Sequence, residues 1–356
     1  AVLNMPQDDD LVICCTRNSL PARTLPRVWP QMHRAYPDFA RRFARLIRAK
    51  RPDVAHLLPL EAAEQQVEKP LKIGNGDWII ERRHCAELSL KECHQYYIQT
   101  GRPLIITGLD DALLSEDCRG LSREWLRANF GMKRVAVRQS FAIGKDDAEL
   151  ITIDEFIHRL DAGEKLYLYD LSLPQQLTAL LLDHIRIPRY FAHCRLQRTR
   201  RRHCFDRSWP TLFIGSKGTH ARLHVDQWHG HFWMCVVSGS KQWTVWHPDD
   251  AHLLSPTVKS GSIHPTFPDL EELQGSDEFS KARRVDFTLH EGEILFVPGG
   301  SPHFVVNAED SVAFAGNFID DSNYEAALAD LRTMGARDSA YSDVVSALEE
   351  VDWEDA

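Results

Sequence analysis

The sequence has no apolar run of the roughly 20 residues that a membrane-spanning helix needs. Its first residues lack the basic flank and apolar stretch of a secretory signal peptide. Eight cysteines are scattered over 356 residues without a Cys-x-x-Cys pair, which favours buried thiols in a reducing compartment over a disulfide scaffold or a structural zinc site. Together with the absence of repeats and low-complexity tracts, these features predict a globular intracellular protein, nuclear or cytoplasmic, with no membrane partner.

Charge of both signs is present but unevenly distributed. The net charge of -9 argues against a protein that coats nucleic acid non-specifically. An arginine-rich run spans Arg198 to Arg202, whereas the stretch from Asp343 to Asp355 is acidic. Three interpretations of the arginine run stay open: a solvated loop, a nuclear-localisation patch, or a contact with RNA or an acidic peptide.

The two ends of the chain and the region before residue 165 have helical character. Residues 1–75 are interpreted as a helical N-terminal extension, because apolar residues such as Phe39 and Phe43 recur at helical spacing. Residues 76–164 read as helices and strands that support a core, with Ser89 as one expected helix cap and either Thr152 or Asp154 as another. Residues 321–356 predict a C-terminal helix and an acidic tail. The oligomeric state stays open, with a dimer through that helix as one option.

Residues 165–320 are dense in short strands. The runs are rich in β-branched and aromatic residues and are separated by Gly, Pro, Asp and Ser. This pattern predicts a mainly β (α+β) protein with flanking helices around a double-stranded β-helix, the jelly-roll or cupin architecture. An insert from Asp249 to Asp286 shows little strand character, and we expect it to be a substrate-facing loop.

A candidate metal site is formed by His224, Asp226 and His303. The first two are two positions apart, so in an extended segment both side chains project from one face. His303 follows the turn-rich Pro298–Gly299–Gly300 and begins a strand that can cross to the same ion. Two imidazoles and one carboxylate match the facial triad of non-haem Fe(II) sites, which leaves coordination positions open for chemistry. A His-x-Asp pair alone carries little weight in a chain with 17 histidines.

Three further polar residues strengthen this interpretation. Lys241 begins a strand after the Gly239–Ser240 turn, and a lysine inside a β-sandwich needs an anion. Tyr167, in an alternating strand, can donate its hydroxyl to that anion, and an inward Asn317 needs a partner of its own. Taken singly, a solvent-facing lysine and a packing tyrosine are the commoner cases.

The motifs His224-Val225-Asp226, Gly239-x-Lys241-x-Trp243, Gly292 to His303 and Asn317-Phe318 together resemble the JmjC (Jumonji-C) family of Fe(II)- and 2-oxoglutarate-dependent oxygenases. The lysine spacing and the Val-Pro-Gly-Gly segment look closest to the Jumonji-type protein lysyl hydroxylases. The resemblance covers roughly residues 165–320, and the region from Trp78 onward is compatible with it.

The resemblance implies roles for particular residues. His224, Asp226 and His303 would bind the catalytic iron, Lys241 would pair with the distal carboxylate of 2-oxoglutarate, and Tyr167 would hydrogen-bond to it. Asn317 would line the cofactor pocket. At three positions this chain departs from what relatives often have: Ala221 replaces a Thr or Ser, Met234 replaces an Asn, and Ala315 replaces a Thr. We therefore expect fewer polar contacts with the cofactor, and we expect Thr219 to substitute for the Thr or Ser at position 221.

The activity that the resemblance implies is hydroxylation of a protein or peptide side chain, lysyl before Arg, Asn or His. O2 would be a cosubstrate, with succinate and CO2 as co-products. Two alternatives stay open: demethylation of N-methyl-lysine or N-methyl-arginine, as in histones, and a catalytically inactive, metal-free cupin-like binding module.

Overall fold

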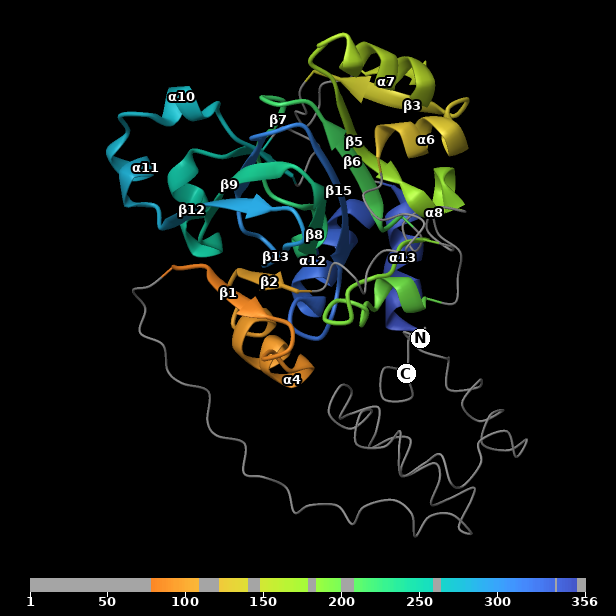
Figure 1. The fold of residues 1–356 in the computed structure, drawn as a ribbon. Coiled ribbons are helices and arrows are strands. Elements are labelled where there is room, and N and C mark those ends of the chain that lie inside the picture. Colours follow the sequence, from red (N-terminus) through yellow and green to blue (C-terminus); the bar gives the residue numbers. More distant parts are fainter. Residues whose placement is uncertain are drawn as a thin grey trace, which may run out of the picture.

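The structure is a computed structural model that describes residues 78–108, 122–139, 148–178, 184–199, 208–258, 264–336 and 338–350 (Figure 1). The expected helical extension over residues 1–75, part of the arginine run (residues 200–202) and the last residues of the acidic tail lie outside these ranges. No helix among the described residues has the length and apolar character to cross a membrane.

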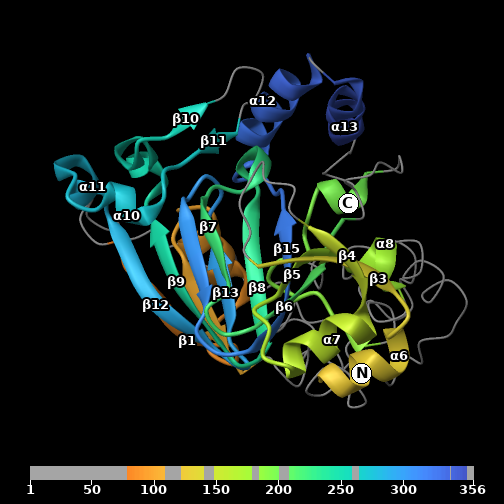
Figure 2. The ribbon, with the colours of Figure 1, turned by 90° about the horizontal axis from the view of Figure 1, so that it is seen from above.

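Two β-sheets packed face to face form the core (Figures 1 and 2). The smaller has four strands in the order β12 (Arg284–His290), β9 (Ser240–Trp246), β14 (His303–Asn307), β7 (His220–His224). The larger has nine, in the order β1 (Glu81–His84), β2 (Leu104–Thr107), β13 (Ile294–Val297), β8 (His231–Ser238), β15 (Ser311–Phe318), β6 (Thr211–Gly215), β5 (Tyr167–Ser172), β3 (Arg134–Arg138), β4 (Glu149–Thr152). This arrangement confirms the predicted double-stranded β-helix.

The inward faces of the two sheets share one apolar cluster. Phe232 and Val236 from β8 pack there with Trp243 and Val245 from β9, because alternate residues of a strand face the same side. The region 76–164 contributes β1–β4 to the two ends of the larger sheet, so it extends the core sheet as well as supporting it.

Helices cover the outer face of the larger sheet. They include α4 (Leu90–Cys93), which continues as a π-helix over His94–Ile98, α6 (Arg123–Phe130), α7 (Ile153–Asp161) and α8 (Leu173–Gln176). The hydroxyl of Ser89 accepts a hydrogen bond from the Glu92 amide at 3.0 Å, and that of Thr152 accepts one from the Glu155 amide at 3.1 Å. Ser89 is confirmed as a cap, and Thr152 rather than Asp154 caps α7.

The insert after β9 covers the outer face of the smaller sheet. It contains a 3-10 helix (Pro248–Leu254), the short strands β10 (Thr257–Val258) and β11 (Pro265–Thr266), α10 (Leu270–Leu273) and α11 (Asp277–Lys281). Leu254 and Leu273 pack against Leu223 and Trp246 of the sheet. The expectation of little strand character is wrong at its end, where β12 begins at Arg284. Exposed Arg284 and Asp286 alternate with inward Val285 and Phe287, as in an edge strand.

Two helices end the described chain, α12 (Tyr324–Gly335) and α13 (Ser339–Glu349), and Figure 2 shows them side by side. The predicted C-terminal helix corresponds to α12. The segment expected to be an acidic tail is helical as far as Glu349, because Val344, Val345 and Leu348 form a buried apolar face while the acidic residues lie on the other side.

Candidate functional site

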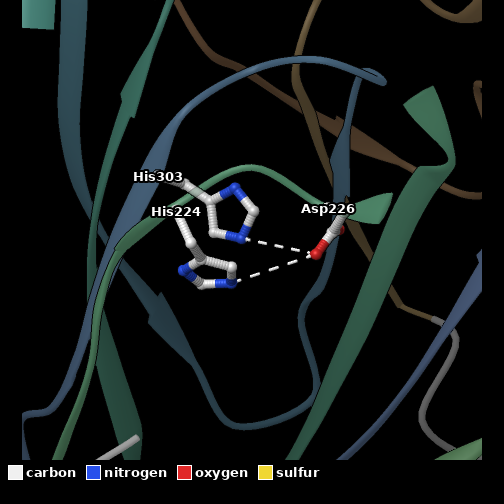
Figure 3. A group of neighbouring side chains, drawn as sticks. All are labelled: His224, Asp226 and His303. Carbon is white, nitrogen blue, oxygen red and sulfur yellow. Dashed lines mark ion pairs between the residues drawn. The ribbon is translucent and has the colours of Figure 1, made fainter. Parts of the chain in front are cut away.

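The three predicted iron ligands lie together between the two sheets. His224 on β7 and His303 on β14 are directly opposite in an antiparallel pair, and their ring centroids are 4.2 Å apart. Asp226 follows the end of β7, and its Oδ1 lies 3.9 Å from His224 Nε2 and 4.0 Å from His303 Nε2 (Figure 3). One ligand atom from each residue therefore falls within 4.8 Å of the other two.

An irregularity in strand pairing aims His224 at this point. Ala221 pairs with Val305 and His224 pairs with His303, so β7 holds one more residue than β14 between the two pairs. A bulge of this kind re-aims side chains and is common beside active sites. It explains how Ala221 and His224, three positions apart, both line the interior.

The second nitrogen of each imidazole is held by the backbone. The Nδ1 of His224 donates to the Arg222 carbonyl at 2.6 Å, and the Nδ1 of His303 donates to the Ser301 carbonyl at 3.0 Å. A carbonyl can only accept, so the proton lies on Nδ1 and the Nε2 lone pair of each ring faces Asp226. Burial lowers the pKa of both imidazoles to about 4, which keeps them neutral near pH 7.

Asn317 lies at the iron end of the site. Its Nδ2 donates to Asp226 Oδ2 at 3.0 Å and thereby leaves Oδ1 facing the two histidines. Burial raises the pKa of Asp226, while the neighbouring His224 and the Asn317 hydrogen bond oppose that rise. Two neutral imidazoles and a carboxylate converge without a cation among them, a donor set that suits Fe(II). The structure gives Asn317 a contact with the carboxylate ligand, and its expected place in the lining of the cofactor pocket stays a prediction.

Lys241 is completely buried on β9, deeper in the sandwich. Its Nζ donates to Asn307 Oδ1 at 2.5 Å and lies 5.3 Å from the centroid of the Tyr167 ring. Burial lowers the pKa of this ammonium to about 7. Among the described residues no carboxylate lies within ion-pairing distance of Nζ, so the charge is met by an amide oxygen and an aromatic face. An anion bound beside Lys241 would therefore neutralise a buried positive charge that no carboxylate of the described residues neutralises.

Asn307 organises the lysine end, and the sequence analysis missed it. Besides accepting from Lys241, its Oδ1 accepts from Ser311 Oγ at 2.8 Å, and its Nδ2 donates to Thr219 Oγ1 at 2.7 Å. Thr219 thus belongs to this network, and its expected role near the cofactor stays a prediction. A usable signal existed: Asn307 follows His303 by an even number of residues on one strand, so both face the same side.

Gly215 makes this network sterically feasible. A Cβ at this position would lie 2.1 Å from Asn307 Nδ2 and 2.9 Å from Thr219 Oγ1 and from Tyr167 Cδ2. Only a residue without a side chain allows these three groups to approach β6 so closely.

A narrow cavity of about 20 Å³ opens beside the three ligands. Ala221 and Met234 lie in its wall, and Ala315 is the direct cross-strand neighbour of Met234. Ala221 and Met234 thus contribute to an apolar part of the wall, and Tyr167 is the lining residue that lies beside the Lys241 ammonium. The lining residues are Tyr167, Tyr169, Phe213, Ala221, His224, Asp226, Phe232, Met234, Trp243, His303 and Val305.

Comparison with known proteins agrees with this geometry. The model of the cupin-like domain family matches residues 91–323. An "Arginine-specific demethylase JMJ20" of Arabidopsis thaliana is 25% identical over 276 residues, 68% of this chain and 58% of the relative. A "2-oxoglutarate and iron-dependent oxygenase JMJD4" of Danio rerio is 26% identical over 115 residues, 32% of this chain and 27% of the relative.

A third relative is "HSPB1-associated protein 1" of Rattus norvegicus, which is 32% identical over 117 residues, 31% of this chain and 24% of the relative. The chain spans less than two thirds of the length of each of these relatives. The family match, in contrast, extends over most of the described core and contains all three predicted ligands. This chain therefore belongs to the cupin-like domain family, and its resemblance to the JmjC oxygenases is supported by relatives that are named a demethylase and a 2-oxoglutarate and iron-dependent oxygenase.

Proposed function

We propose that this chain is an Fe(II)- and 2-oxoglutarate-dependent oxygenase that hydroxylates a protein side chain, with lysine as the first candidate. One observation carries the proposal. Among the described residues, three metal ligands converge at one end of a single buried site, and at the other end a buried ammonium has no carboxylate side chain within ion-pairing distance. An iron ion and a dicarboxylate cosubstrate meet both needs.

The residues at the iron end would bind and orient the metal. His224 and His303 offer neutral Nε2 atoms because their Nδ1 protons are engaged by backbone carbonyls. Asn317 holds the Asp226 carboxylate so that one oxygen faces the metal position. When bound, the iron and 2-oxoglutarate supply the oxidising chemistry that hydroxylates a C–H bond, with O2 consumed and succinate and CO2 released.

The residues at the lysine end would hold the cosubstrate. Lys241 supplies the positive charge for a carboxylate, and Asn307 and Ser311 keep its position fixed. The Tyr167 side chain lines the cavity and lies beside the ammonium. The apolar side formed by Ala221, Met234 and Trp243 excludes water from the reacting groups.

Demethylation is the second candidate, and one observation favours it. The relative that aligns with the largest part of this chain among those described above is named an arginine-specific demethylase. Both candidates use the same iron chemistry and differ only in the carbon that is oxidised. Hydroxylation of an N-methyl group releases formaldehyde, whereas hydroxylation of a side-chain carbon leaves a stable alcohol.

Mass spectrometry of peptides incubated with the protein, Fe(II), 2-oxoglutarate and O2 tests the proposal. Lysine peptides that gain one oxygen atom support hydroxylation, and methylated peptides that lose a methylene unit support demethylation. His224→Ala should abolish either change together with succinate formation. No turnover with any peptide or with 2-oxoglutarate alone would return the chain to the binding-module alternative, and turnover that persists without iron would overturn the proposed iron dependence.

A further inference from the structure

The segment that follows the carboxylate ligand has an unusual backbone. Trp228 and His229 are consecutive non-glycine residues with φ angles of 56° and 48°. The left-handed region is unfavourable for L-residues because Cβ crowds the carbonyl oxygen. Such a conformation persists only where surrounding contacts impose it. The contacts of residues 227–230 therefore help to set the position of Asp226.

Those contacts come from the C-terminal helices. The indole Nε1 of buried Trp228 donates to Met334 Sδ on α12 at 3.2 Å, and its ring meets Tyr341 of α13 edge-on with centroids 6.2 Å apart. His229 Nδ1 lies 2.9 Å from Asp330 Oδ2 on α12. Each left-handed residue is thus held by a side chain of α12.

The side chain of Asn323, at the start of α12, holds residues 227–230 by a hydrogen bond to the backbone of that segment. Its Nδ2 donates to the His229 carbonyl at 2.9 Å, and its Oδ1 accepts from the Asp320 amide at 2.8 Å. The side chain is only 6% exposed, so no water replaces these bonds easily.

The loop that leads to His303 rests on this segment as well. A Cβ at Gly299 would lie 2.0 Å from the His229 carbonyl oxygen, so the two backbones are in direct contact. The Gly299 amide also donates to Nδ1 of His231 at 2.9 Å. The segment after Asp226 and the loop before His303 therefore contact each other, and the first of them also contacts α12.

We propose that the helix pair α12–α13 is a positioning element of the metal site, and that Asn323 and Trp228 are positioning residues that act through residues 227–230 on Asp226. The family match ends at residue 323, so Trp228 and Asn323 lie within it, whereas Asp330, Met334 and Tyr341 of the two helices lie beyond it. The inference rests on the proposed function for the identity of the metal.

The test is a titration of the full chain with Co(II), as an oxygen-stable probe, followed by ligand-field absorption in the absence of 2-oxoglutarate. Asn323→Ala and Trp228→Phe should each weaken binding by about tenfold and change the band shape, because residues 227–230 lose a contact that helps to position the Asp226 carboxylate. Asn323→Asp keeps the acceptor for Asp320 and loses the donor to His229, so it should match Asn323→Ala. Thr333→Ala, on the exposed side of α12, is the matched control and should bind like wild type.

Thermal unfolding of each variant separates a positioning role from a structural one. Variants that melt earlier but bind Co(II) with wild-type affinity and an unchanged spectrum would overturn the inference while leaving the proposed function intact. A wild-type chain that binds neither Co(II) nor Fe(II) would overturn both. Trp228→Phe preserves an aromatic ring in the buried site, so it stays informative where Asn323→Ala does not fold.

Discussion

The iron end and the lysine end of the site differ in charge although they share one strand. His303 and Asn307 both belong to β14, and their side chains are both buried on its inner face. At the first, neutral imidazoles and a carboxylate converge without a cation. At the second, an ammonium is held by an amide oxygen without a carboxylate within ion-pairing distance among the described residues.

The charged groups nearer the surface behave in the opposite way. Arg283 binds Asp250 through two nitrogens, at 2.8 and 2.9 Å, and Arg159 contacts both Glu149 and Glu164. Near the surface, where water lowers the free-energy cost of an unpaired charge, the charged side chains have partners of opposite charge. In the interior, where that cost is highest, the charged groups described above have none among the described residues. The contrast indicates that the two interior ends are reserved for ligands of opposite charge.

The largest expected effect is at the iron end. His224→Ala removes one of three ligands, so Fe(II) binding and iron-dependent succinate formation should both fall below detection. His290→Ala, which removes an exposed imidazole from the same sheet, is the control and should leave both unchanged. If His224→Ala retains wild-type turnover, the iron end has been wrongly located.

The second prediction concerns the lysine end alone. Lys241→Met keeps a long side chain and removes the charge, so the KM for 2-oxoglutarate should rise by about 100-fold. Fe(II) affinity measured without 2-oxoglutarate should stay within about twofold of wild type, because Lys241 contacts Asn307 and Tyr167 and none of the three ligands. Parallel loss of both affinities would contradict the separation of the two ends.

The third prediction is a pH dependence of the apoprotein. Burial lowers the pKa of Lys241 from 10.5 to about 7, so between these values the unfolded chain binds more protons than the folded chain. The free energy of unfolding should therefore gain a contribution from Lys241 as pH rises from about 7 toward 10.5, of the order of a few kcal/mol at most.

Urea unfolding near pH 7 and near pH 9.5 measures this contribution as the difference between wild type and Lys241→Met. The variant should be the more stable protein at the lower pH, and the gap should narrow at the higher pH. An equal gap at both values would show that the ammonium is not destabilised by burial in the absence of an anion.

The smallest expected effect concerns the orientation of the carboxylate ligand. Asn317→Ala removes the donor to Asp226 Oδ2 and should weaken Fe(II) binding by about tenfold, with a smaller effect on the KM for 2-oxoglutarate. Asn129→Ala, at an exposed helical position, is the control. A larger effect on the KM for 2-oxoglutarate than on Fe(II) binding would instead support the pocket-lining role expected from the sequence.

Much of the site could be predicted because its elements are local. His224-Val225-Asp226 lies within three residues, and the strands that carry Lys241 and His303 show clear β patterns. The geometry brings the three ligands together and places Thr219, Tyr167 and Lys241 at the other end; their roles stay predictions. The even spacing from His303 indicates only which way Asn307 faces; its importance was missed because its partners come from three other segments of the chain.

Features that depend on long-range packing were also hidden. The bulge in β7 arises from its pairing with β14 and leaves no mark in the sequence of β7. The partner of Asn317 is 91 positions away, and α13 is helical because its apolar face packs against other helices. The start of strand β12 was wrongly predicted to be part of the insert because exposed charged residues alternate with its apolar residues.

The missing side chain at Gly215 makes the cosubstrate end sensitive to a single methyl group. An alanine there would press on Asn307, Thr219 and Tyr167 together while leaving the three metal ligands untouched. If the lysine end holds the cosubstrate, as proposed, Gly215→Ala should weaken the binding of 2-oxoglutarate and leave the binding of the metal unchanged.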